Sequence, residues 1–182
     1  MKAFAHFIIA LAVAALVMLA FRGLAFTVCT IGGNALAPVF ERGDRVLVNR
    51  WSYGLRTGRE GSIFNYGRIC HRDIKRGDIV AFDSPADSLS GVFICRCKAV
   101  PGDTIATASG TVIVPGLATC ADGNYYWMES INRKDSADSR LFGFVPESSI
   151  IGRVCMVVYN HDDTQPFYTG YNTNRLLLLT EH

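Results

Sequence analysis

The chain has 182 residues, of which 49% are hydrophobic, and carries a formal net charge of +2 at pH 7. This length allows one ordinary domain plus a short appendage, with a core that needs no disulfide support. The small charge argues against a nucleic-acid-binding surface, and the mean hydropathy of +0.21 is high for a soluble protein. We therefore predict one domain joined to an apolar segment, and no nucleic-acid partner.

The apolar segment lies at the amino terminus. Residues 3–21, AFAHFIIALAVAALVMLAF, contain no Asp, Glu, Lys or Arg. At about 1.5 Å per residue, a helix of this length approaches the roughly 30 Å core of a bilayer. A cleavable signal peptide is the alternative, since Lys2 supplies a positive start, but its apolar part runs to about 15 residues. We predict a single N-terminal transmembrane anchor over residues 1–26 and a folded domain over residues 27–182.

Few charges determine the orientation of this anchor. Lys2 and Arg22 flank the apolar segment on opposite sides, so the local positive charge is nearly balanced. We expect the amino terminus inside and the domain on the exported side, because long domains translocate largely regardless of charge. The basic run from Arg42 to Arg76 indicates a solvated face, with contact to anionic lipid headgroups as the alternative.

Beyond Phe26, short β-branched and aromatic runs alternate with turn residues, a pattern typical of strands. Three Gly-Asp pairs, in GDRV, RGDI and PGDT, come at or before such runs and suit hairpin turns. No convincing amphipathic helix follows. We predict an all-β domain with loops at 57–67 and 83–91 and with strands at DRVLVNR, DIVAFD, VFICRCKAV, TVIV, NYYWME and IIGRVCMVVY.

The cysteines show no spacing typical of a metal site. There is no CxxC pair and no cysteine–histidine pattern of the zinc type, so the sequence predicts neither a metal nor a cofactor. Disulfide pairing in an exported domain stays open, and buried free thiols are the default expectation. The six cysteines are Cys29, Cys70, Cys95, Cys97, Cys120 and Cys155.

The order of the segments resembles that of one known family. The apolar span is followed by IGGNALAPVFERGDRVLVNRWSYG, RGDIVAF, ICRCKAVPGDTI and INRKDSADSRLFGFVPESSIIGRV. This order is similar to bacterial type I signal peptidase, the Ser-Lys endopeptidase of the S26 family, and DSADSRLFGFVP is the most specific part. The resemblance implies a membrane-anchored, signal-peptidase-like antiparallel β-sheet domain that cleaves signal peptides from exported proteins.

The resemblance also implies a catalytic pair, and both members are replaced. Laying the family's SGSMMPT box on GGNALAPV puts the nucleophilic serine at Ala35 and an oxyanion-binding serine at Gly33. Counting back six residues from Pro101, in the family's KRVxGxPGD box, puts the general-base lysine at Cys95. Removing members of such a constellation costs on the order of 10⁶-fold in turnover. We therefore interpret the chain as a pseudoprotease.

Two residues could in principle replace the missing chemistry. Lys98 is rejected as a base, because strand alternation puts it on the face opposite Cys95. Cys95 could act as a nucleophile, but a thiol needs a base or a positive neighbour to populate the thiolate, and none is identifiable. An inert core cysteine is the favoured interpretation.

Further positions are implied to support the site or to bind the substrate. By resemblance, Ser136 matches a serine that hydrogen-bonds the family lysine, and Asp138 and Arg140 match an ion pair that reaches the arginine at Arg96. A peptide bound as an added strand would be flanked by Ile31, Gly32, Asn34, Val92, Phe93 and Ile94.

The function that follows is binding without cleavage at the cytoplasmic membrane. The expected partners are signal-peptide-bearing exported proteins or an active signal peptidase, together with membrane lipid. One alternative is an active signal peptidase, if Ala35 and Cys95 are engineered or another nucleophile is used. The other is an envelope structural protein with an aromatic contact set at Trp51, Tyr53, Phe64 and Tyr66. The carboxy-terminal NRLLLLTEH is too short to span a bilayer.

Overall fold

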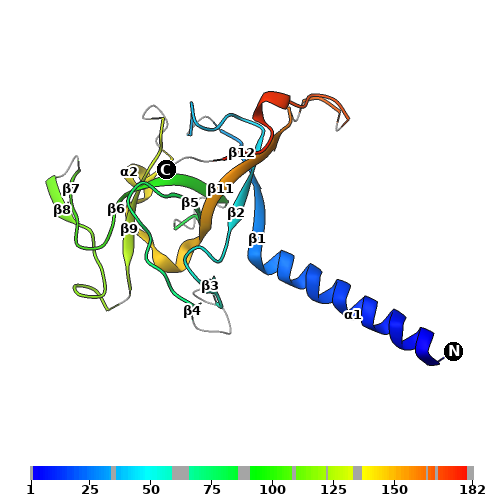
Figure 1. The fold of residues 1–182 in the computed structure, drawn as a ribbon. Coiled ribbons are helices and arrows are strands. Elements are labelled where there is room, and N and C mark those ends of the chain that lie inside the picture. Colours follow the sequence, from blue (N-terminus) through cyan, green and yellow to red (C-terminus); the bar gives the residue numbers. More distant parts are fainter. Residues whose placement is uncertain are drawn as a thin grey trace.

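The chain forms an amino-terminal helix and a domain made mostly of antiparallel strands (Figure 1). The computed structural model describes residues 2–33, 36–58, 66–85, 91–107, 110–121, 123–132, 137–162, 164–166 and 168–179. The predicted all-β domain is confirmed in these residues, where the longest helix after the first is α2, Ser139–Phe142.

Helix α1, Lys2–Ala25, contains the apolar segment. Its large side chains are exposed, from Phe4 at 69% to Met18 at 71%, and it extends away from the sheet (Figure 1). None of the helices in the described part of the chain is long and apolar enough to cross a membrane. The structure thus contains the predicted helix, but the prediction that residues 3–21 span a bilayer is not borne out.

One curled sheet of eight strands forms the centre of the domain, in the order β1-β2-β11-β5-β6-β9-β10, with β12 paired to β11. The bounds are β1 Phe26–Thr30, β2 Asp44–Asn49, β5 Ile79–Asp83, β6 Val92–Ala99, β9 Tyr125–Glu129, β10 Val145–Pro146, β11 Ile150–Asn160 and β12 Leu178–Leu179. Two smaller pairs join β3 Leu55–Arg56 to β4 Arg68–Ile69, and β7 Thr104–Thr107 to β8 Gly110–Ile113. Two 3-10 turns are η1 Glu147–Ser149 and η2 Thr173–Arg175.

All six predicted strand runs contain a strand, namely β2, β5, β6, β8, β9 and β11. The strands that the prediction missed include four of two residues, β3, β4, β10 and β12, which are too short to show an alternating pattern. Strand β1 follows directly on α1, so its apolar residues merge with the helical run in sequence. The segment NRLLLLTEH contributes β12, whose Leu178 lies opposite Val157 of β11.

Two hydrophobic clusters lie on opposite faces of the central strands. On β5, the buried Ile79 and Ala81 belong to one cluster, and Val80 and Phe82 belong to the other. Strand β6 alternates in the same way, since Ile94 joins the first cluster and Cys95 the second. Because β5 is covered on both faces, its sequence is continuously apolar rather than alternating.

The three Gly-Asp pairs form turns of one design. Gly43 has a φ of 88°, a left-handed conformation that glycine adopts without a Cβ clash. The carboxylate of Asp44 accepts a hydrogen bond from the Glu41 N–H at 2.8 Å. The carboxylates of Asp78 and Asp103 likewise accept hydrogen bonds from the backbone N–H groups three residues before them, at 3.1 and 2.9 Å. Each aspartate therefore closes its own turn.

Arginines from other segments form ion pairs with all three aspartates: Arg175 with Asp44, Arg76 with Asp103, and Arg153 with Asp78 at 3.6 Å. Burial acts to raise the pKa of Asp44, but hydrogen bonds from Arg175, the Glu41 amide and Asn160 outweigh it and lower the pKa. Hydrogen bonds from Arg76 and the Val100 amide lower the pKa of Asp103. The ionised carboxylates are thus favoured by the fold.

Acid is therefore expected to destabilise the domain. Because the folded pKa values of Asp44 and Asp103 lie below the unfolded value of about 3.9, their contribution to stability is present above that pH and is lost as pH falls through the folded values. Urea unfolding between about pH 7 and pH 2 should show this decline, and Asp44→Asn should flatten it. The exposed Asp73→Asn is the control. An unfolding free energy that stays constant in acid would contradict the expectation.

Candidate peptide-binding site

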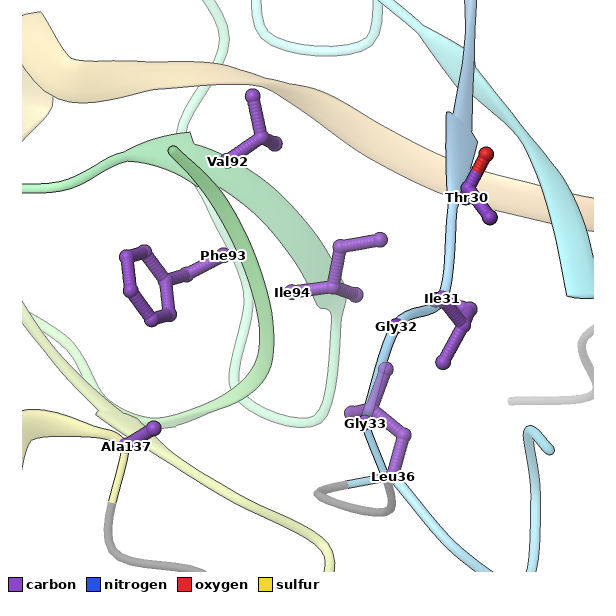
Figure 2. Close-up of a pocket in the computed structure, with 9 residues that line it drawn as sticks. All are labelled: Thr30, Ile31, Gly32, Gly33, Leu36, Val92, Phe93, Ile94 and Ala137. Carbon is purple, nitrogen blue, oxygen red and sulfur yellow. The ribbon is translucent and has the colours of Figure 1, made fainter. Parts of the chain in front are cut away.

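A pocket of about 260 Å³ opens between β1 and β6. Figure 2 shows Val92, Phe93 and Ile94 of β6 on one side and the Thr30–Gly33 stretch on the other, with Leu36 and Ala137 near the base of the view. Ile31 and Ile94 are 6% and 8% exposed and belong to the same hydrophobic cluster. The pocket therefore has an apolar lining that continues into the core.

Strand β6 pairs with β5 along one edge. The Cys97 N–H donates to the Asp78 C=O at 2.8 Å. In the same register of the two strands, Cys95 lies opposite Val80. Alternate residues of an antiparallel strand bond with a given neighbour. Cys95 and Phe93 therefore bond with β5, and the backbone groups of the residues between them point to the other edge.

That other edge of β6 is open beside the pocket. The N–H and C=O groups of Val92 and Ile94 point toward it, and β9 pairs with β6 only from Arg96 onward within the described residues. These groups can therefore donate hydrogen bonds to an added strand and accept hydrogen bonds from it.

Among the described residues, β1 is an edge strand, and it presents a second open edge to the same pocket. The Ile31 N–H donates to the Asp44 C=O at 2.8 Å, so the odd-numbered residues of this stretch bond with β2. The backbone groups of Thr30 and Gly32 point the opposite way, and both residues line the pocket. Two strand edges thus face one apolar space.

Cys95, predicted at the position of the general base, is a core residue. It is 1% exposed and lies in the cluster with Val80, Phe82 and Met128. Its Sγ donates to the C=O of Ala137, a pocket residue, at 3.8 Å. Lys98 is exposed while its neighbours Cys97 and Ala99 are buried, as strand alternation predicts. Lys98 is therefore separated from Cys95 by the strand itself.

Asp138 and Arg140 form an ion pair at the start of α2. The Arg140 Nη2 lies 2.6 Å from Asp138 Oδ2, and the Asp138 side chain also accepts hydrogen bonds from the backbone N–H groups of Ser130 and Arg140 at 2.9 Å. Burial acts to raise the pKa of Asp138, but the Arg140 and backbone hydrogen bonds outweigh it and lower the pKa. Asp138 thus caps α2 and joins it to the end of β9.

The remaining predicted site residues are placed less centrally, or lie outside the described part. Arg96 is exposed, and within the described residues no ion pair joins it to Asp138. At Gly33 an added Cβ would meet no atom within 4 Å, so the backbone leaves room for a serine there. Asn34, Ala35 and Ser136 lie outside the described residues.

Three pocket residues were not predicted from the sequence. Thr30, Leu36 and Ala137 line the pocket beside the predicted residues. Each is a direct chain neighbour of a predicted site position, which is the signal that could have found them. Leu36 is 2% exposed and also belongs to the hydrophobic core, so its apolar character alone does not distinguish a pocket residue from a core residue.

The cysteines and most of the aromatic residues singled out in the sequence lie within the described residues. None of the six cysteines is joined in a disulfide, and burial raises the pKa of the Cys97 thiol to about 12. Among the described residues, no group of His, Cys, Asp and Glu could hold a metal ion. Of the proposed aromatic contact set, Tyr53 is 3% exposed and donates to Asp78 at 2.9 Å, so it is a core residue. Phe64 lies outside the described residues.

Comparison with known proteins identifies the family. A family model described as signal peptidase, peptidase S26, matches residues 4–121 and 116–159. The chain belongs to this family. It is 29% identical over 146 residues to the probable signal peptidase I-2 of Synechocystis, covering 68% of this chain and 58% of that protein. The chain is therefore matched over less than two thirds of that relative's length.

Two further relatives agree with the S26 assignment. The signal peptidase I of Leptolyngbya laminosa is 28% identical over 139 residues, covering 68% of this chain and 64% of that protein. The mouse mitochondrial inner membrane protease subunit 1 is 33% identical over 93 residues, covering 50% and 53%. The resemblance to signal peptidases seen in the sequence is thus confirmed.

Restoring the S26 family's lysine at Cys95 is expected to destabilise this chain. A lysine in the 1% exposed position would lose hydration, so Cys95→Lys should lower the free energy of unfolding at pH 7 by about 4 kcal/mol. The loss should shrink as the pH rises toward about 10, because the unfolded lysine, with a pKa of about 10.4, then begins to lose its proton as well. Urea unfolding at both pH values measures this, with Arg96→Lys on the exposed face as control. Equal stability of Cys95→Lys and the natural chain would contradict it.

Proposed function

We propose that this signal peptidase homologue binds extended, apolar segments of exported precursor proteins and does not cleave them. The observation that carries the proposal is the pair of open strand edges, at Thr30 and Gly32 and at Val92 and Ile94, on either side of one apolar pocket. A peptide lying between them could bond with both edges, as in other cases of strand addition. Backbone bonds give affinity, and the pocket selects the side chain.

The pocket chemistry supports a segment with small or apolar side chains. Ile31, Leu36 and Ile94 form an apolar floor, and the nearby glycines at 32 and 33 let a peptide backbone approach closely. Burying a peptide side chain there stabilises the complex by roughly 25 cal/mol per Å² of apolar surface. The relatives are signal peptidases, which supports the end of a signal peptide as the segment that the pocket would accept.

Inactivity is the second part of the proposal. Alanine at position 35 has no nucleophilic atom, and Cys95 is buried in the core beside apolar side chains. A buried, apolar environment disfavours the charged thiolate that a cysteine nucleophile needs. The proposal is therefore that the site binds and orients a peptide without hydrolysing it.

A second candidate function is that of an accessory subunit of an active peptidase. The observation that favours it is the match to three vertebrate proteins named mitochondrial inner membrane protease subunit 1. In this case the same pocket would receive a precursor segment and present it to an active partner. Binding of precursor is common to both candidates, so it is tested first.

The cleavage and binding test uses a precursor with a signal peptide and the full-length chain in detergent. We expect the natural chain to retain the precursor uncut, and the double variant Ala35→Ser, Cys95→Lys to regain measurable cleavage if the remaining site is intact. Cleavage by the natural chain above background would overturn the proposed inactivity. Absence of binding would overturn the proposed function.

A matched pair of variants tests the binding mode. Val92→Pro removes an N–H that points to the open edge, whereas the ladder with β5 is kept. Loss of one hydrogen bond is worth about 1 kcal/mol, or roughly fivefold in affinity. Val92→Ala keeps the N–H and should bind nearly as the natural chain does, so equal weakening by both variants would contradict strand addition.

Attachment to a membrane, with the β domain on the exported side, is also proposed. Helix α1 exposes large apolar side chains, including Leu11 at 62% and Val17 at 64%, and such a surface favours the lipid interface. Leu11→Glu together with Val17→Glu should abolish most sedimentation with phospholipid vesicles. The control is Ile113→Glu on β8, where the side chain is 59% exposed. Unchanged sedimentation of the α1 variant would contradict this attachment.

A further inference from the structure

A carboxy-terminal segment, residues 172–179, which we call the strap, lies against the turn at residues 36–44. This turn follows the β1 side of the pocket. It consists of η2 and β12, and β12 pairs with β11. The Asn172 N–H donates to the Asn160 C=O at 3.2 Å, which fixes the start of the strap to the end of β11. Figure 1 shows the strap at the same end of the sheet as the start of β2.

One side chain of the strap bonds with three residues of the turn. The Arg175 guanidinium holds both carboxylate oxygens of Asp44, at 2.9 and 2.6 Å. It also donates to the Val39 C=O at 3.0 Å and to the Glu41 carboxylate at 3.2 Å. Its side chain is 12% exposed and that of Asp44 is 0% exposed. A planar guanidinium can make this set of bonds, whereas an ammonium group cannot.

The turn at residues 36–44 also positions two residues that line the pocket. The Asp44 C=O accepts the Ile31 N–H at 2.8 Å, and the Gly43 N–H donates to the Ile31 C=O at 2.9 Å. The Phe40 N–H donates to the Leu36 C=O at 3.1 Å. Ile31 and Leu36 both line the pocket. A continuous set of hydrogen bonds therefore leads from Arg175 to the pocket wall.

We propose that Arg175 is a positioning residue of the peptide pocket, and that the strap sets the shape of the pocket by holding the turn at residues 36–44. This inference rests on the proposed peptide binding. Of its bonds with described residues, the buried Asp44 carboxylate would keep those from Asn160 and the Glu41 amide if Arg175 were removed. An uncompensated buried charge is costly, so the turn would shift or admit water, and Ile31 would move with it.

The test compares Arg175→Ala with Arg68→Ala. Arg68 is a more deeply buried arginine away from the turn, with a 2% exposed side chain and bonds to the C=O groups of Gly54, Glu147 and Ile150. At a temperature where both variants are folded, we expect Arg175→Ala to weaken binding of a signal-peptide segment about tenfold, within the usual range for coupled sites. Arg68→Ala should leave the affinity within about twofold, well below that range.

A conservative variant separates positioning from simple loss of stability. Arg175→Lys keeps the charge without the planar fork, so part of the affinity should return. It also preserves the comparison if Arg175→Ala does not fold. Equal weakening by the Arg175 and Arg68 variants, in proportion to their loss of stability, would overturn the positioning role.

Amide hydrogen exchange tests the same inference without peptide. Arg175→Ala should accelerate exchange at Ile31 and Gly43, and Arg68→Ala should not. If the natural chain binds no peptide, the proposed function fails, while faster exchange at Ile31 still supports control of the pocket wall by the strap. Unchanged exchange at both amides in the Arg175 variants overturns the inference whether or not peptide binds.

Discussion

The side chains of strand β6 pack into two hydrophobic clusters, and its backbone groups point to two different edges. Ile94 and Cys95 point into opposite hydrophobic clusters, while Cys95 bonds with β5 and the groups of Ile94 face the open edge. A shift of one residue would exchange all of these assignments at once, which makes the register expensive to change. The pocket therefore exists because the register of β6 is fixed by the cores on both sides.

The same constraint is compatible with the proposed loss of activity in an S26 fold. A working base at position 95 would have to be held neutral by burial, at a cost in desolvation. A cysteine there fills the cluster with no charge to desolvate. Asp138, by contrast, caps α2 and accepts the buried Ser130 amide, so its removal would cost stability whether or not the protein catalyses a reaction.

The Gly-Asp turns show how one local device acquires different long-range roles. In each turn the aspartate accepts the amide three residues before it, which depends only on nearby sequence. The arginine partners come from elsewhere: Arg175 is 131 residues from Asp44, whereas Arg76 is 27 residues from Asp103. The first pair therefore links the end of the chain to the pocket wall, and the second joins neighbouring loops at the surface.

The sequence by itself determined the all-β class, the six main strands, the amino-terminal helix and the S26 family, because these depend on periodicity, turn residues and ordered motifs. It could not decide whether Tyr53 lies in the core or on the surface, because both places accept the same local composition. Only the tertiary structure decided that two open edges face one pocket and that Arg175 reaches Asp44. Those properties arise from strand register and from contacts between residues far apart in the chain, which local sequence does not encode.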